Sequence, residues 1–364
     1  MKKTFERPLD DILDRARWAP SGDNRQSFRF EIVDDSHVIV HAFDTRHDCV
    51  YDLDGSASQI ALGALLETMR IAASVHRLRL DVTRRAGAAV EAPLVDVRLT
   101  ADASIEPDRL SAFIETRTVN RRPLGRRPLT AVERSALLAS VGDDHDVVWR
   151  EGSARRRVAS LLFKSARLRL TMPEAYLVHR DAIEWGATFS NDRVPEAAVG
   201  LDPVTARLMR WVMQSWDRVH FFNRFLAGTW APRLQLDVLP ALMCAAHFVL
   251  VAKRPAEGID DFIAGGRALQ RFWLTADQLG LQLQPELTPL IFARYFRARL
   301  TFSRTDGMTR DAGRIATLLE AEVGKAAAEG AVFMGRVGAG NAAKSRSLRL
   351  PIERLMVGNP TRRD

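Results

Sequence analysis

Residues 19–30 read APSGDNRQSFRF and connect a helical pattern to a strand pattern. Apolar residues recur at helical spacing from Leu9 to Ala16, and residues 28–33 alternate as in a short strand. Between them, a serine hydroxyl, two side-chain amides and backbone N–H groups fall close together, which suits the polar edge of a planar heterocycle. The same residue types also favour an ordinary helix stop and turn. The stretch by itself leaves both interpretations open.

Two arginine-rich stretches stand far apart in the chain. Residues 117–127 read RTVNRRPLGRR, and residues 344–351 read KSRSLRLP. Guanidinium groups bind phosphate bidentately and keep their charge at any working pH, so the two stretches together predict a shared phosphate site. A solvated basic surface is the alternative interpretation of each.

Local signals outline two halves. Ser56 and Gln59 have the spacing of a capping box before a helix whose small residues, Gly63 among them, indicate close packing on another helix. Thr130 and Glu133 predict a second capping box. Helix, polar loop, strand and helix follow in the same order twice. We therefore expect an internal duplication, with an N-terminal half at 1–100 and a C-terminal half at 101–364 that carries a helical insertion at about 172–235.

These strings together resemble a known family. APSGDNRQSFRF is similar to the APSxxNxQPWxF string of the FMN-dependent nitroreductase superfamily, and RTVNRRP resembles its phosphate loop in the form RRTNRRP of internally duplicated, single-chain members. Residues 265–285 resemble the family's core helix and the loop over its flavin. RVGAG and RSLRLP resemble the last strand and the C-terminal phosphate arginine. The strings follow one another in the family's order and span most of the chain.

The resemblance implies an α+β fold with antiparallel sheets flanked by helices, in which the two halves of one chain form a pseudo-dimer around FMN. Val119 stands where the family has Ser or Thr, and Ser27 where it has Pro. Only one complete pair of loops is present, so we expect one flavin per chain. The implied cofactor-binding residues are Pro20, Ser21, Asn24 and Gln26 at the ring, Arg117, Thr118, Asn120, Arg121, Arg346, Ser347 and Arg349 at or near the phosphate, and Pro285, Glu286 and Leu287 near flavin N5.

The resemblance also implies an oxidoreductase that moves hydride from NAD(P)H to flavin N5 and on to a small organic acceptor. No side chain is identified as catalytic, because the flavin carries the chemistry. A flavin-binding storage protein with little turnover is the alternative, and an enzyme that acts on the flavin itself with oxygen is a third possibility. The acceptor and the choice between NADH and NADPH stay open.

Composition excludes several other classes. The net charge is +8, but 47 of the 53 basic residues are arginines spread along the chain and no nucleic-acid module accompanies them, so no nucleic-acid partner is expected. Cys49 and Cys244 stand in no metal-binding or disulfide spacing, and no metal site is predicted. No apolar run follows the basic N-terminus, so a cytoplasmic protein without stable membrane association is expected. A homodimer is compatible with the sequence.

One segment has no clear place in this scheme. Residues 204–230 carry an apolar stripe with arginines on the opposite face. A core helix, a lid over the flavin and a partner face are the main interpretations, and a membrane-surface helix is a less favoured one.

Overall fold

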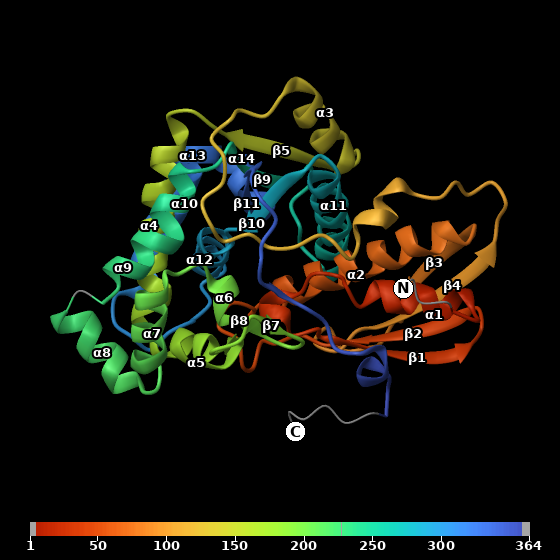
Figure 1. Ribbon diagram of the computed structural model, residues 1–364, viewed down its shortest axis with the longest axis horizontal. Helices are drawn as coiled ribbons and strands as arrows, with labels where there is room; N and C mark the ends of the chain where they lie inside the picture. The colour runs from red at the N-terminus through yellow and green to blue at the C-terminus, as the bar shows by residue number, and fades with distance from the viewer. Residues whose placement is uncertain (1–4, 227, 359–364) are drawn as a thin grey trace.

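The computed structural model describes residues 5–226 and 228–358 of the chain. Two four-stranded sheets lie on opposite sides of a layer of helices (Figure 1). Every strand pair within these two sheets is antiparallel, which confirms the predicted α+β class. The outer ends of the predicted halves, residues 1–4 and 359–364, lie outside the described residues, as does residue 227 within the predicted insertion.

The first sheet has one covered face and one open face. Its strands, in the order β1-β2-β4-β3, are β1 (Phe28–Asp34), β2 (His37–Ala42), β4 (Leu94–Ala101) and β3 (Leu78–Arg84). Helices α1 (Pro8–Ala16) and α2 (Ser56–Val75) pack on the covered face, where Phe30, Val40 and Val97 are fully buried. The apolar face predicted for α1 is buried there too. The alternating burial in β3 shows that the opposite face is solvated.

The second sheet is covered on both faces. Its strands, in the order β10-β11-β9-β5, are β10 (Leu281–Pro285), β11 (Ala331–Ala339), β9 (Ala246–Ala252) and β5 (His145–Arg150). One face packs against α11 (Ile259–Gln278) and α3 (Ala131–Ser140). The other packs against α4 (Ala154–Thr171), α12 (Thr288–Arg297) and α13 (Met308–Val323). Burial on both faces explains why β9 and β11 are almost continuously apolar.

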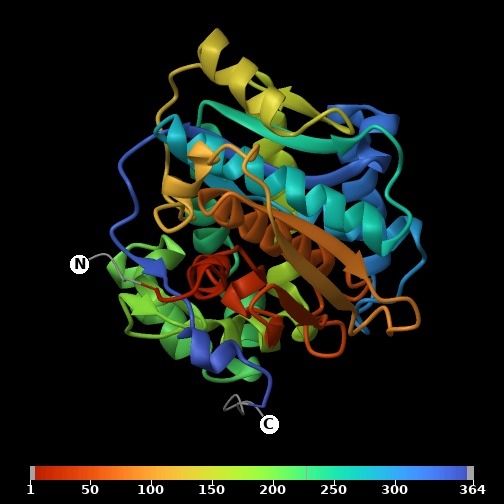
Figure 2. The same ribbon diagram turned by 90° about the vertical axis from the view of Figure 1, so that its right-hand side faces the viewer.

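The two sheets share one topology. In each, two strands precede a 20-residue helix and two follow it, and the spatial order is first, second, fourth, third. The two helices, α2 and α11, run side by side between the sheets (Figure 2). A Cβ on Gly63 would lie 2.0 Å from the carbonyl oxygen of Ile263, and a Cβ on Gly266 would lie 2.0 Å from that of Ile60. The close helix packing predicted at Gly63 is thus confirmed, and it is reciprocal.

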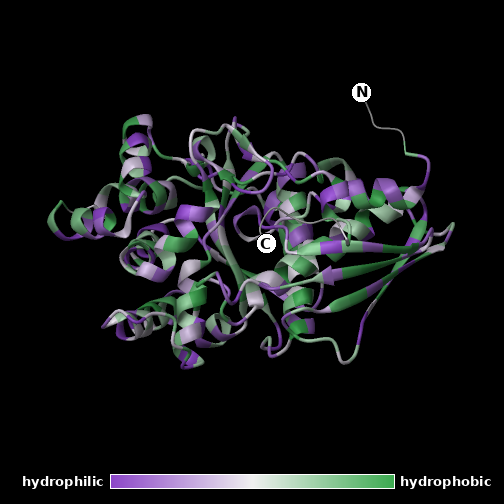
Figure 3. Cartoon of the chain, turned by 90° about the horizontal axis from the view of Figure 1, so that it is seen from below, coloured by the Kyte–Doolittle hydropathy of each residue, from purple (hydrophilic) through white to green (hydrophobic). Residues whose placement is uncertain are grey.

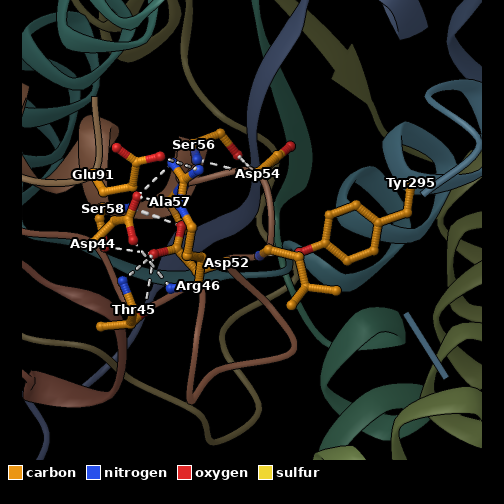
Figure 4. Close-up of polar contacts among 11 residues, drawn as sticks. Asp44, Thr45, Arg46, Asp52, Asp54, Ser56, Ala57, Ser58, Glu91 and Tyr295 are labelled. Carbon is orange, nitrogen blue, oxygen red and sulfur yellow. Dashed lines mark hydrogen bonds and ion pairs between the residues drawn. The ribbon is translucent and has the colours of Figure 1, made fainter. Parts of the chain in front are cut away.

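The N-terminus of α2 is capped differently from the prediction. Gly55, at φ 74°, is the N-cap residue, and the capping box expected of Ser56 and Gln59 does not form. Instead, the buried carboxylate of Asp52 accepts hydrogen bonds from the backbone N–H groups of Ala57 and Ser58 at 2.9 and 3.1 Å (Figure 4). The negative charge of this carboxylate also interacts favourably with the positive end of the helix dipole. The capping box of Thr130 and Glu133 is confirmed at α3.

Between β5 and β9 the chain forms a group of short elements beyond α4. They are α5 (Pro173–Ala182), β6 (Ile183–Glu184), β7 (Phe189–Ser190), β8 (Val194–Pro195), α6 (Glu196–Val199), α7 (Pro203–Val212), α8 (Trp216–Phe225), α9 (Trp230–Pro232) and α10 (Leu239–Leu242). The apolar stripe is therefore divided between α7 and α8 rather than continuous in one helix. In the part of the chain that the structure describes, no helix is long and apolar enough to cross a bilayer.

The C-terminal segment returns to the first sheet. After β11 comes the short strand β12 (Arg346–Ser347), and Met356 then forms a bridge with Phe30 of β1. The backbone N–H of Val357 donates to the carbonyl of Phe30, and Leu355 is fully buried in the core beside α1. Residues near both ends of the chain thus share one core.

Candidate functional site

Three arginines from two distant stretches gather around Trp18, which follows α1. Arg117 and Arg349 each donate to the carbonyl oxygen of Trp18, at 3.0 and 3.4 Å. The Arg346 guanidinium carbon lies 4.9 Å from the centre of the Trp18 ring. The guanidinium of Arg117 also stacks on Trp273 of α11 at 4.5 Å. The structure therefore brings together two arginine strings that are more than 200 residues apart in sequence.

Arg117 and Arg349 are buried and Arg346 is half-buried, and none of the three guanidinium groups is bonded to a carboxylate among the described residues. Arg117 is only 3% exposed; burial, reinforced by the charge of Arg346, lowers its pKa to about 9. Burial and then the charges of Arg117 and Arg346 lower the pKa of Arg349 well below its usual value. Asp277, whose negative charge acts on Arg117 and Arg346, accepts from the hydroxyl of Thr116 instead. The Nε atoms of Arg117 and Arg346 have no hydrogen-bond partner among the described residues. A bound anion would reduce the repulsion between the guanidinium charges and would accept hydrogen bonds from the unpartnered Nε groups.

The loop at residues 20–26 is tightly wound. Asp23, Asn24 and Gln26 all have positive φ, at 48°, 63° and 51°, which is uncommon for residues with a side chain. The Ser21 hydroxyl accepts from the backbone N–H of Gln26 at 3.0 Å, and Pro20 is half-buried just before it. Strained backbone of this kind persists where surrounding contacts hold it, and it concentrates at functional sites.

Most polar groups of this loop connect it to other segments. The Gln26 amide donates to the carbonyls of Asn24 and Asn191 and accepts from the N–H of Leu350. The Asn24 amide donates to the carbonyls of Arg193 and Leu348. Asn24 Oδ1 and Trp18 Nε1 stay buried with no partner in the described chain. A ligand here would therefore meet one free acceptor and one free donor.

A segment of the inserted region lies across the loop and the C-terminal stretch. We call residues 188–198 the strap. β7 of the strap pairs with β12, the Leu348 N–H donates to the Ser190 carbonyl at 2.7 Å, and the Ser347 hydroxyl donates to the Arg193 carbonyl at 2.9 Å. The strap was missed in the sequence because its contacts are made mainly by backbone carbonyls, which leave no residue-type signal.

The loop at 117–121 runs alongside β10. Val119 forms a bridge with Leu283, and the Asn120 N–H donates to the Leu283 carbonyl. The Asn120 amide donates to Gln282 and to the carbonyl of Asn341, whereas the Thr118 hydroxyl makes only a long 3.5 Å contact with its neighbour's carbonyl. Asn120 thus fixes the position of the loop, whereas the Thr118 hydroxyl has no short hydrogen bond to the described chain.

Arg121 bonds a different segment from the other three arginines. It donates to the carbonyl of Ala198 in the strap, and burial lowers its pKa although the charge of Asp23 opposes that shift. Its own carbonyl accepts from Arg336 at 3.0 Å. The structure therefore groups Arg117 with Arg346 and Arg349 and places Arg121 next to the loop at 20–26.

Glu286, at the end of β10, belongs to a buried charge network. It bonds Arg336 at 2.8 Å and His247 Nδ1 at 2.7 Å. Although burial opposes it, the charge of Glu286 raises the pKa of His247 to about 10. His247 and Arg336 were overlooked in the sequence, although a charged residue within each of two apolar strands is a readable signal.

Part of the backbone at the end of β10 is already hydrogen-bonded within the sheet. The Glu286 N–H donates to the carbonyl of Met334 at 2.8 Å, and Pro285 pairs with Gly335 in the sheet. Leu287 is half-buried and is the N-cap residue of α12, with no side-chain cap. The N–H groups in the first turn of α12 have no partner within that helix.

A cavity of about 390 Å³ opens elsewhere, on the solvated face of the first sheet, lined by His37, Asp81, Thr83, Arg85, Asp96 and Arg98. Its central carboxylate, Asp96, is already bonded to His37 and Arg85, each at 2.7 Å. The charges of this cavity are thus balanced, unlike those around Trp18. Within residues 5–226 and 228–358, no group of three or more His, Cys, Asp and Glu side chains is placed to hold a metal ion.

Comparison with known proteins gives distant matches. No family model matches the chain. An uncharacterized protein of Mycobacterium tuberculosis is 24% identical over 294 residues, which are 79% of this chain and only 40% of that protein's length.

Among solved structures, a nitroreductase-like family protein from Bacillus cereus aligns with 68% of this chain and 95% of its own, at 11% identity and a TM-score of 0.34. An FMN-dependent nitroreductase from Mycobacterium smegmatis, crystallised with NADPH, aligns with 69% of this chain and 96% of its own, at 17% identity and a TM-score of 0.37.

Proposed function

We propose that this chain is an FMN-dependent oxidoreductase whose cofactor phosphate lies among Arg117, Arg346 and Arg349. The observation that carries the proposal is the convergence of these three guanidinium groups, two of them buried, without a bonded carboxylate among the described residues. Uncompensated buried charge is costly, so such a cluster is expected to have an anionic ligand. A phosphate dianion has the charge and the acceptor oxygens to satisfy the unpartnered Nε donors of Arg117 and Arg346.

The surrounding residues fit the rest of such a cofactor. Trp18 Nε1 and Asn24 Oδ1, a donor and an acceptor without partners, offer hydrogen bonds to a heterocycle with both kinds of group. Trp18 and Trp273 give aromatic surface next to the arginines. Bound FMN would supply the redox chemistry by accepting and releasing hydride at N5. The chain's own task is then to hold the phosphate, orient the ring and keep water from it.

We further propose that the site is built between two nitroreductase-like halves, residues 1–100 and 101–364. The shared strand order of the two sheets and the reciprocal packing of Gly63 and Gly266 support this division. One half contributes the loop at 20–26 and the other contributes residues 117–121 and 346–349. Since neither half has both loops, the proposal requires one FMN per chain.

The proposed reaction takes hydride from NAD(P)H and passes electrons to a small organic acceptor. A storage protein is the second candidate, and the strap favours it. Its backbone carbonyls accept hydrogen bonds from Asn24, Gln26 and Ser347, so it holds this loop and the C-terminal stretch together. A firmly closed strap would hold FMN and exclude the donor.

Anaerobic bleaching of the flavin separates these functions. The purified chain is loaded with FMN and mixed with NADH or NADPH without oxygen. A reductase bleaches rapidly with one of them. A store bleaches only when the strap is loosened, for which we suggest Ser190→Ala with Ser345→Ala, since these hydroxyls bond Arg193 N–H and the Thr188 carbonyl. The matched control is Ser160→Ala on the exposed face of α4. Failure to bind FMN would refute the proposal.

A further inference from the structure

Part of the predicted apolar stripe is buried, because Val212 of α7 and Val219 of α8 pack with Tyr176 in a small cluster. Other large apolar side chains in and just after these helices are exposed, at the end of the molecule farthest from the first sheet (Figure 1). Six large side chains are between 47% and 64% exposed: Leu208, Trp211, Phe221, Phe225, Leu226 and Trp230. The core interpretation therefore holds for only part of the stripe, and it is the strap that bonds the loop at 20–26. We call these six residues and the arginines between them the α7–α8 surface.

This surface combines its apolar side chains with excess positive charge. Residues 203–226 hold four arginines and one acid, Asp217. Within the described part of the chain, only Arg210 of these four is paired with a carboxylate, that of Glu196. Arg218 lies over the ring of Trp211 at 4.5 Å, and Arg224 lies over Phe225 at 5.5 Å. Hydrophobic and hydrophilic residues alternate along these helices at one end of the molecule (Figure 3). Aromatic side chains with arginines folded along them are typical of helices that lie at a membrane interface.

We propose that the α7–α8 surface docks reversibly on an anionic lipid surface. Phe221, Phe225 and Trp230 would enter the headgroup region while Arg207 and Arg224 contact lipid phosphates. A symmetric contact with a second copy fits less well, because it would bring the arginines of both copies together. An acidic protein partner would match the charge, but the described surface is a protruding helix pair and not a groove that would grip one.

The test is sedimentation of the full-length protein with vesicles, which needs no flavin and so fails or succeeds independently of the proposed function. We expect binding to vesicles of equal parts phosphatidylcholine and phosphatidylglycerol, and none to phosphatidylcholine alone. Binding should disappear in about 1 M salt, where the Debye length is about 3 Å. Exposed tryptophans should be quenched by brominated lipid in the bound state.

Two variant pairs test the residues. Arg207→Gln with Arg224→Gln should weaken binding by about 25-fold, since each arginine near an anionic surface contributes about fivefold. Phe221→Ser with Phe225→Ser should abolish the quenching. The matched controls, Arg98→Gln with Arg109→Gln and Val90→Ser with Val132→Ser, change exposed residues elsewhere and should bind as the wild type does.

Three outcomes would overturn the proposal. The first is no binding to anionic vesicles. The second is equal loss in the control variants, which would mean that general positive charge is responsible. The third is a concentration-dependent dimer in light scattering that Phe221→Ser with Phe225→Ser converts to a monomer, which would assign the surface to a second copy.

Discussion

Replacement of Gly63 by alanine is expected to separate the two central helices. The added Cβ would lie 2.0 Å from the carbonyl oxygen of Ile263, whereas ordinary contact begins at 3.4 Å, so α2 and α11 must move apart by about 1.4 Å. Backbone atoms make this contact, and a change of rotamer cannot relieve it. Overpacking of a core costs about 1 to 3 kcal/mol, and a rigid contact belongs at or above the upper end of that range. Alanine regains about 1 kcal/mol of helix propensity.

We therefore expect Gly63→Ala to lower the free energy of unfolding by at least about 2 kcal/mol. Gly266→Ala should cost a similar amount, because its Cβ would meet the Ile60 carbonyl at the same 2.0 Å. The double variant should cost clearly less than the sum, since one separation of the helices relieves both contacts.

Urea unfolding followed by circular dichroism measures these differences. Gly22→Ala is the control, because no atom lies within 4 Å of its added Cβ. A Gly63→Ala protein as stable as the Gly22→Ala protein would refute the proposed close approach. Strict additivity in the double variant would refute the argument that the two glycines relieve one shared contact.

Further predictions concern the site, the buried network and the helix cap. Arg117→Gln and Arg349→Gln should each weaken FMN binding about ten- to hundredfold in fluorescence titrations and riboflavin binding far less; equal losses would place the phosphate elsewhere. His247, whose pKa rises from 6.5 to about 10 on folding, should stabilise the fold fully below pH 6.5 and progressively less as the pH rises to about 10. The stability difference between wild type and His247→Gln should therefore shrink over that interval, and a constant difference would contradict the assignment. Asp52→Asn should cost about 1 to 3 kcal/mol of unfolding free energy, whereas Asp306→Asn, in an exposed loop, should cost little; similar losses would show that Asp52 does not cap α2.

The sequence by itself determined the features that depend on near neighbours. The amphipathic face of α1, the capping box of Thr130 and Glu133, and the strands around residues 28–42 were all predicted and are present. Their signals lie within a few residues, because helix and strand periods and capping bonds are local. The residue types of the arginine strings also indicated an anion site before their arrangement was known.

Only the tertiary structure decided which distant groups meet. Arg349 joins Arg117 at Trp18 because the C-terminal segment returns to β1, while Arg121 in the same predicted loop donates to the Ala198 carbonyl of the strap instead. The strap is invisible in the sequence because carbonyl oxygens make its bonds. Asp52, and not Ser56, accepts from the first N–H groups of α2, because a buried carboxylate is a stronger hydrogen-bond acceptor than a serine hydroxyl. Such outcomes depend on burial and on chain segments far apart, and no local pattern contains them.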